Sequence, residues 1–219
     1  MNVAYQLNQY DKRHRLLKEH SPQQSRSFVK AFLQLLYCQT SNLTQNVVDI
    51  TNTSRSFATT PEKSAWSDVC HPGLDSADNC VYLIGGGSSA GYPPRTDCGA
   101  DEKGIVVGTS STAVAVADDN LVAPIAHGSS AGQFVHYGCW GLNYTTGASS
   151  ASFDVERIFR NDSGGSIVVA EIGMYAGSMV SLLTFLELSF CILRDVLGAT
   201  VTVLNGEYLK VKYTITVSN

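Results

Sequence analysis

Apolar and polar positions alternate most clearly at the C-terminal end of the chain. Between residues 209 and 217 every second residue is apolar, with lysine and threonine between them. Because successive side chains of a strand point to opposite faces, this alternation predicts an antiparallel strand with one buried and one solvated face. Asn205-Gly206 precedes the segment and favours a tight hairpin turn, since both residues tolerate positive φ. The apolar members are Leu209, Val211, Tyr213, Ile215 and Val217.

Shorter apolar segments upstream predict further strands, and turn-rich sequence separates them. The strongest turn signal is the Asn-Asp-Ser-Gly-Gly sequence at residues 161–165. Many short strands without alternating helices are typical of a sandwich or barrel, and not of a parallel βαβ fold. The predicted fold class is mainly β: an antiparallel β-sandwich, jelly-roll or immunoglobulin-like, with an N-terminal α-helical arm. The expected strands are 81–84, 104–109, 112–117, 133–142, 152–160, 166–175, 186–193 and 200–204.

The arm is expected in the first 60 residues. Residues up to about 24 are polar and mixed in charge, whereas apolar residues recur at spacings of three and four from Ser25 onward. We therefore predict residues 1–60 as an arm with an amphipathic helix and residues 61–219 as the sandwich domain. The apolar face of the helix packs either on its own domain or on a neighbouring subunit. Its candidate subunit-interface residues are Phe28, Phe32, Leu35 and Leu36.

An insertion rich in cysteine, glycine and proline is expected at about residues 66–100 of the sandwich domain. Loops of this length are usually functional or interactive. Three of the six cysteines lie here, and Cys70, Cys80 and Cys98 are the candidate disulfide residues if the protein meets an oxidising medium. Their connectivity is open. Cys191 lies in an apolar segment and is expected as a small buried residue.

Charge is scarce, and its distribution excludes some partners. Charged residues make up 16% of the chain, against roughly 25% in typical soluble domains, so other subunits are expected to cover part of its surface. The net charge of −4 argues against a nucleic-acid partner. The one basic stretch, residues 12–18, is expected as a solvated helix face or arm, or as a contact with an acidic neighbour. No apolar run is long enough to span a membrane, and no secretory signal is visible.

Two Gly-x-Ser-x-Gly sequences raise the possibility of a serine hydrolase. They place Ser89 and Ser130 at their centres, with His127 and His136 near the second as conceivable bases. The motif requires a helix after the serine. The first is followed by Tyr92-Pro93-Pro94 and the second by a predicted strand, so flexible loops are the better interpretation. No catalytic residue is predicted.

No cofactor or metal site is predicted either. Gly85-x-Gly87-x-x-Ala90 resembles a dinucleotide fingerprint but lacks the helix that would hold the pyrophosphate. Cys70, His71, Cys80 and Cys98 lack the paired spacing typical of zinc ligands. Glu171, inside a predicted strand, is expected to pair with Arg157 or Arg194, or to face solvent.

Three sequence blocks together resemble a module of tailed-bacteriophage virion proteins. The first contains GIVVGT at 104–109 and continues to His127-Gly128. The second contains RIFRN at 157–161 and EIG at 171–173. The third contains LRDV at 193–196, Asn205-Gly206 and Tyr213. The resemblance covers about residues 104–217, roughly half of the chain.

This resemblance implies an antiparallel β-sandwich that serves assembly or attachment in phage tail, fibre or capsid-associated proteins. The expected function is a non-enzymatic structural protein of the tail, neck or baseplate, made in the host cytoplasm and located in the virion. Its expected partners are copies of itself and neighbouring virion proteins. The alternatives are a capsid decoration protein and a module that binds a host glycan or receptor through Trp66, Tyr92, Trp140 and Tyr144.

Overall fold

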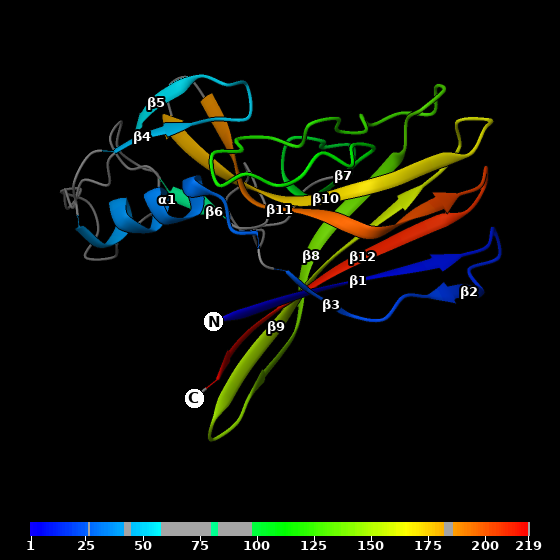
Figure 1. Cartoon of the computed structure of the whole chain (residues 1–219), viewed down its shortest axis with the longest axis horizontal. Coiled ribbons are helices and arrows are strands. Elements are labelled where there is room, and N and C mark those ends of the chain that lie inside the picture. The colour runs from blue at the N-terminus through cyan, green and yellow to red at the C-terminus, as the bar shows by residue number, and fades with distance from the viewer. Residues whose placement is uncertain (26, 42–44, 58–79, 83–97, 182–185, 219) are drawn as a thin grey trace.

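The computed structural model describes residues 1–25, 27–41, 45–57, 80–82, 98–181 and 186–218. Within these ranges the protein is mainly β and has one short helix, α1 (Lys30–Ser41). All paired strands are antiparallel, and most belong to two sheets (Figure 1). The mainly-β antiparallel prediction is therefore confirmed.

The larger sheet has six strands and contains both ends of the described chain. Its order is β2-β1-β12-β9-β8, and β3 also pairs with β1. Its strands are β1 (Asn2–Tyr10), β2 (Leu16–Glu19), β3 (Gln23–Ser25), β8 (Val135–Thr146), β9 (Ser150–Arg160) and β12 (Tyr208–Ser218).

The smaller sheet has four strands and is built around a long hairpin. β10 (Ile167–Ser181) pairs with β11 (Leu186–Val203) on one side and with β6 (Cys80–Tyr82) and β7 (Gly104–Gly108) on the other. A separate two-stranded ribbon joins β4 (Gln45–Val48) to β5 (Ser54–Phe57).

Both sheets contribute side chains to one apolar core. The inward residues of β12 and β1 alternate as strand geometry requires, and they meet buried residues of β7, β10 and β11. A buried carboxylate ties the sheets together: Asp195 of β11 accepts hydrogen bonds from the Tyr213 hydroxyl of β12 (3.1 Å) and the Ser25 hydroxyl of β3 (2.8 Å). Burial, together with the charge of Asp195, raises the pKa of Tyr213 well above its usual value.

The N-terminal segment, expected as part of an arm, is a strand inside the larger sheet. β1 pairs with β12 along its whole length, from Asn2 opposite Thr216 to Tyr10 opposite Tyr208. Its alternate residues Val3, Tyr5 and Leu7 are buried. The structure does not show a helical arm, because this segment completes the β-rich body.

The helix follows β3 and lies against the chain's own core. Val29, Ala31 and Leu35 are buried, and the rings of Phe28 and Phe32 stack with centroids 4.3 Å apart while packing on that core. Of the four candidate interface residues, only Leu36 is largely exposed. Phe28, Phe32 and Leu35 thus pack on the chain's own core, and the subunit-interface role of this face stays a prediction.

Two local predictions were wrong. Residues 112–117, expected as a strand, have no regular secondary structure. Asn205-Gly206 does form a turn, in which Glu207 N donates to Leu204 O (3.0 Å) and Gly206 has φ +85°. However, the turn joins β11 in the smaller sheet to β12 in the larger one, so it is not a hairpin.

The irregular segment after β7 is held by a buried ionic network. Glu171 of β10 pairs with Arg194 of β11 and accepts the backbone N–H groups of Val122 and Ala123. Arg194 also pairs with Asp118 at 2.7 Å. Burial alone would lower the pKa of Arg194. The hydrogen bonds of Arg194 to Asp118 and Glu171 outweigh this effect, so the pKa is raised. Of the alternatives for Glu171, the pair with Arg194 is the one that forms.

Candidate interaction surface

The most exposed part of the larger sheet is the distal half of the β8–β9 hairpin. All residues from 140 to 150 are exposed. In Figure 1 this hairpin projects away from the smaller sheet, beside the C-terminal end of β12. Leu142 is 43% exposed and Tyr144 is 72% exposed. Large apolar side chains at such exposure on an edge strand make this hairpin the candidate interaction surface.

Strand β8 is also the open edge of that sheet. It pairs with β9 on one side, and no strand in the described part of the chain pairs with its other side. Two irregularities interrupt its pairing with β9, one between His136 and Cys139 and one between Leu142 and Thr145. Asn143, in the second, has φ +54° and donates to the Asp154 carboxylate at 2.9 Å.

Parts of the edges at β7 and β11 are covered by the chain itself. Next to β7, Ile125 N donates to Val107 O, and Thr109 N donates to Ala123 O. Next to β11, Val29 N donates to Ile192 O. These segments occupy backbone groups of β7 and of β11 between Ser189 and Arg194.

The proximal part of β8 is covered as well, by residues 99–105. Gly99 N donates to His136 O at 2.9 Å. The buried guanidinium of Arg157, from β9, connects this covering segment to β8. It donates to Tyr137 O of β8 (2.8 Å) and, in the covering segment, to Ile105 O (2.8 Å) and Ala100 O. Burial lowers the pKa of Arg157, and the carbonyls compensate its charge. Residues 140–150, further along the hairpin, are exposed.

His136 lies in the covered part of β8. Its side chain is buried, its ring lies 5.0 Å from that of Phe159, and neither ring nitrogen has a hydrogen-bond partner of good geometry. Burial, followed by the charge of Arg157, lowers the pKa of His136 to about 4. A neutral imidazole here packs as an aromatic ring.

Charge distribution distinguishes the two edges of the larger sheet. From Tyr137 to Phe153 there is no Asp, Glu, Lys, Arg or His. At the opposite edge, β2 is only four residues long and carries Lys18 and Glu19. Short, charged edge strands resist pairing with other chains, whereas long uncharged ones favour it. The outer face next to the hairpin is polar, with Lys210 and Glu156 forming a partly exposed pair at 3.4 Å.

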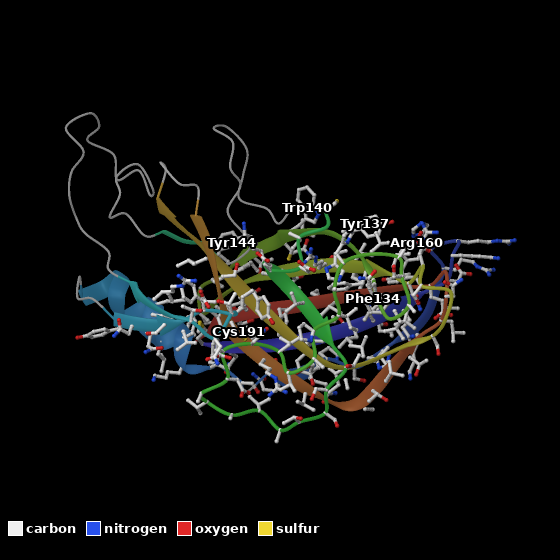
Figure 2. All side chains as sticks on the ribbon, turned by 90° about the horizontal axis from the view of Figure 1, so that it is seen from above. Phe134, Tyr137, Trp140, Tyr144, Arg160 and Cys191 are labelled. Atoms are coloured by element: carbon white, nitrogen blue, oxygen red, sulfur yellow. The ribbon has the colours of Figure 1, made fainter. Side chains whose placement is uncertain are left out.

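The exposed aromatic residues include two of the four proposed for glycan binding. Figure 2 shows Tyr137 and Trp140 along one side of the molecule. Trp140 is 44% exposed, and Tyr144 lies further along the same strand. Trp66 and Tyr92 lie outside the described residues. The structure therefore places Trp140 and Tyr144 on one strand.

The basic stretch lies at the other end of the larger sheet. Residues of the β1–β2 turn and the turn before β12 line an open cleft of about 430 Å³. Arg15 pairs with Asp11 at 2.7 Å, and Glu207 accepts Leu204 N. Acidic side chains thus offset part of the basic charge. The stretch is exposed to solvent, but it forms the β1–β2 turn and part of β2 instead of a helix face.

The possible hydrolase residues are not assembled around Ser130. This serine is exposed, and its backbone N–H donates to the Gln133 side chain at 3.1 Å. His127, one of the two candidate bases, accepts a hydrogen bond from His136 N at its Nδ1. Within the described ranges no histidine contacts the Ser130 hydroxyl. Ser89 falls outside those ranges.

The predicted disulfide residues are only partly described. Cys98 is exposed, and Cys139 and Cys191 are buried; all three are free thiols. Burial raises the pKa of Cys139 to about 11 and raises that of Cys191 further. Cys70 lies outside the described residues, and only the backbone of Cys80 is described, in β6. The disulfide stays a prediction, whereas Cys191 is buried as expected.

The described part of the chain contains no group of three or more His, Cys, Asp or Glu side chains arranged to bind a metal ion. None of its helices is long and apolar enough to cross a membrane.

The exposed edge of β8 was not identified from the sequence. The signal that points to it is the long charge-free stretch, which is visible in the sequence but also occurs in buried strands. Only the pairing pattern shows that this stretch is an open edge.

Comparisons with protein-family models, with curated proteins and with solved structures found no significant match.

Proposed function

We propose that this protein is a structural component of a tailed-phage virion, which assembles through protein–protein contacts in the tail, neck or baseplate. The fold we propose for it is a β-sandwich of the jelly-roll or immunoglobulin-like type, in which the two sheets enclose the core. The proposal rests on the resemblance in residues 104–217 and on one structural observation: in the described part of the chain, the distal half of β8 exposes large apolar side chains on an edge strand with no strand paired to its outer side.

The residues that carry the resemblance also support one another in the fold. Glu171, Arg194 and Asp118 form the buried network. Asn161 is fully buried and donates to Gly165 O and Val203 O, both at 2.8 Å, so it joins the turn before β10 to the end of β11. These residues therefore maintain the framework, and they leave the assembly role to exposed surfaces such as the hairpin.

The test is to look for the protein in purified particles. Mass spectrometry of phage particles purified by density gradient should detect it at a fixed ratio to the other virion proteins. Immunogold labelling should place it on the tail, neck or baseplate. Labelling on the head would favour the capsid decoration alternative. Detection only in the soluble fraction of infected cells would contradict a virion location.

Binding to a host glycan or receptor is the second candidate, and the exposure of Trp140 and Tyr144 on one strand favours it. Aromatic rings stack against apolar faces of sugars and pack in protein interfaces. A glycan array and a cell-binding assay with the wild type and with Tyr144→Ala would test it. Loss of a specific signal in the variant would support binding through this strand.

A further inference from the structure

We infer that His127 and His136 form an acid-sensitive switch, which keeps residues 99–103 on β8 while both imidazoles are neutral and releases them when the imidazoles are protonated. These residues are the part of the covering segment that precedes β7. The inference goes beyond the proposed function and does not depend on it, because it concerns contacts within one chain.

The ring of His127 lies between β8 and the covering segment. Gly128 N donates to Phe134 O at 2.8 Å, which fixes the backbone next to His127 at the start of β8. On one side of the ring, Nδ1 accepts His136 N at 3.0 Å. On the other side, Gly99 lies so close that an added Cβ would be 3.3 Å from Nε2. The ring therefore contacts both parts of the structure that the switch joins.

The contact with His136 N requires a His127 ring without a proton on Nδ1. A neutral imidazole has one nitrogen that accepts a hydrogen bond, whereas an imidazolium donates from both and accepts at neither. Protonation of His127 would thus remove the acceptor of the His136 N–H group. The backbone N–H of His127 also donates to the Asp101 carboxylate of the covering segment at 3.2 Å.

His136 is the buried member of the switch. Its side chain is 1% exposed, and neither ring nitrogen has a hydrogen-bond partner of good geometry. Its backbone oxygen accepts Gly99 N at 2.9 Å, so the covering segment lies directly on this residue. A charged imidazole here would be buried without a partner, which is unfavourable. Departure of the segment would let water solvate that charge, so protonation favours release.

Arg157 lies beneath the same segment and strengthens this effect. Its guanidinium donates to Ala100 O and to Lys103 O (2.9 Å). Protonation of His136 would place a second positive charge beside it under one short cover. Because both charges are better solvated when the cover is absent, their proximity also favours release in acid.

The other charged and titratable groups at this site do not cancel the effect. Burial and Arg157 lower the pKa of His136 to about 4, and a charged His127 acts in the same direction. The Ala100 backbone and Asp101 act in the opposite direction and only reduce the shift. The remaining titratable groups, which act on Arg157, are Asp101, Cys98 and Cys139.

The experiment is amide hydrogen exchange of the full chain, followed by NMR at pH 7.5 and pH 5. Protection factors correct the rates for the intrinsic dependence of exchange on pH. The amides of Gly99 and His136 report directly, because each donates one of the hydrogen bonds that release would break. In the open form His136 regains its ordinary pKa of 6.5, so the open form binds more protons. Linkage then predicts a loss of protection of about 20-fold at pH 5.

The internal control is a second irregular segment that covers a strand without a histidine. Ile125 N donates to Val107 O, and Thr109 N donates to Ala123 O, both at 2.9 Å. Their protection factors should change less than about 2-fold over the same pH range, since no imidazole contacts these bonds. This comparison needs no substitution and separates local release from a general loss of stability.

The double variant His127→Asn with His136→Phe tests the origin of the effect. The asparagine oxygen can still accept the backbone N–H of residue 136 but cannot be protonated in this range, and the phenyl ring keeps the buried aromatic contact. The amides of residues 99 and 136 should then keep their protection at pH 5. The matched control is His14→Asn in the exposed β1–β2 turn, which should lose protection like the wild type.

Three results would overturn the inference. The first is equal protection of Gly99 and His136 at both pH values. The second is an equally large loss at Ile125 and Thr109, which would show that acid loosens the whole fold. The third is an undiminished loss in the double variant. Each of them leaves the particle experiment, and with it the proposed virion role, unaffected.

Discussion

The fully buried side chains of Glu171 and Arg194 form an ion pair of 2.9 Å between neighbouring strands β10 and β11. Arg194→Met should leave the carboxylates of Glu171 and Asp118 without their cation. Because breaking a buried pair leaves an uncompensated charge, we expect the free energy of unfolding to fall by about 3–5 kcal/mol. Urea unfolding followed by circular dichroism measures the change.

The control for that substitution is Lys210→Met. Lys210 also pairs with a glutamate across two strands, but its pair with Glu156 is partly exposed and 3.4 Å long. Its loss should change the free energy of unfolding by no more than about 1 kcal/mol. Similar effects from both substitutions would contradict the role assigned to the buried network.

Gly173 of β10 allows close packing of Leu121, the residue that anchors the irregular segment after β7. A Cβ at Gly173 would lie 2.5 Å from Leu121 Cδ1 and 2.8 Å from the Leu193 carbonyl oxygen. Since the carbonyl belongs to the backbone of a paired strand, the clash cannot be relieved by a rotamer change alone. Gly173→Ala should therefore lower the free energy of unfolding by about 1–3 kcal/mol.

Gly198→Ala is the matched substitution in the neighbouring strand, because nothing lies within 4 Å of the added Cβ. It should be close to neutral in the same urea experiment. If Gly173→Ala proved equally neutral, the proposed packing of Leu121 over Gly173 would have to be abandoned.

Much of the β-structure could be predicted because alternation of apolar and polar residues directly reflects which face of a strand is buried. Most of the strands expected from residue 104 onward are present, and β12 matches the clearest pattern. In β1 the same period of two is carried by Val3, Tyr5 and Leu7. The polar residues between them and the basic stretch that follows hid this pattern, so the segment was expected in an arm.

Long-range relationships could not be predicted in the same way. Asn205-Gly206 specifies a turn, but a turn does not determine whether the next strand returns to the same sheet. Here β12 finds its partners in β1 and β9, which are distant in sequence. The openness of β8 is also a property of the whole fold, because it depends on which other segments cover the edges. Glu171 could be assigned three environments from the sequence, and only tertiary packing selects Arg194.

Asn161 is expected to be the most sensitive position of the turn between β9 and β10. Its buried side chain donates to Gly165 O and Val203 O and accepts Ser163 N. Asn161→Ala would leave these buried groups without partners, which should lower the free energy of unfolding by about 2–4 kcal/mol.

Asn205→Ala is the appropriate comparison for Asn161→Ala. Asn205 accepts one bond, from Gly164 N at 2.9 Å, in an exposed turn. Water can replace this bond, so the loss should be about 1 kcal/mol or less. Thermal unfolding of the two variants side by side measures the difference, and a larger effect for Asn205→Ala would argue against the buried role of Asn161.

Stability should also decrease at acidic pH because of His136. Burial, with further contributions from Arg157 and His127, lowers the pKa of this imidazole from 6.5 to about 4, although Asp101 and the Ala100 backbone act in the opposite direction. Between these pH values the unfolded chain binds more protons than the folded chain. The free energy of unfolding should therefore fall as the pH drops from 6.5 to 4, by roughly 3 kcal/mol from this group.

The substitution His136→Phe tests this origin, because a phenyl ring keeps an aromatic side chain against Phe159 and cannot be protonated. Urea unfolding at a series of pH values should show a shallower decrease for the variant than for the wild type. The control His14→Asn removes a histidine from the exposed β1–β2 turn, where φ is +61° and asparagine is tolerated; it should keep the wild-type slope. An unchanged slope in His136→Phe would assign the acid sensitivity to other groups, because removing the responsible imidazole must remove its linkage to protons.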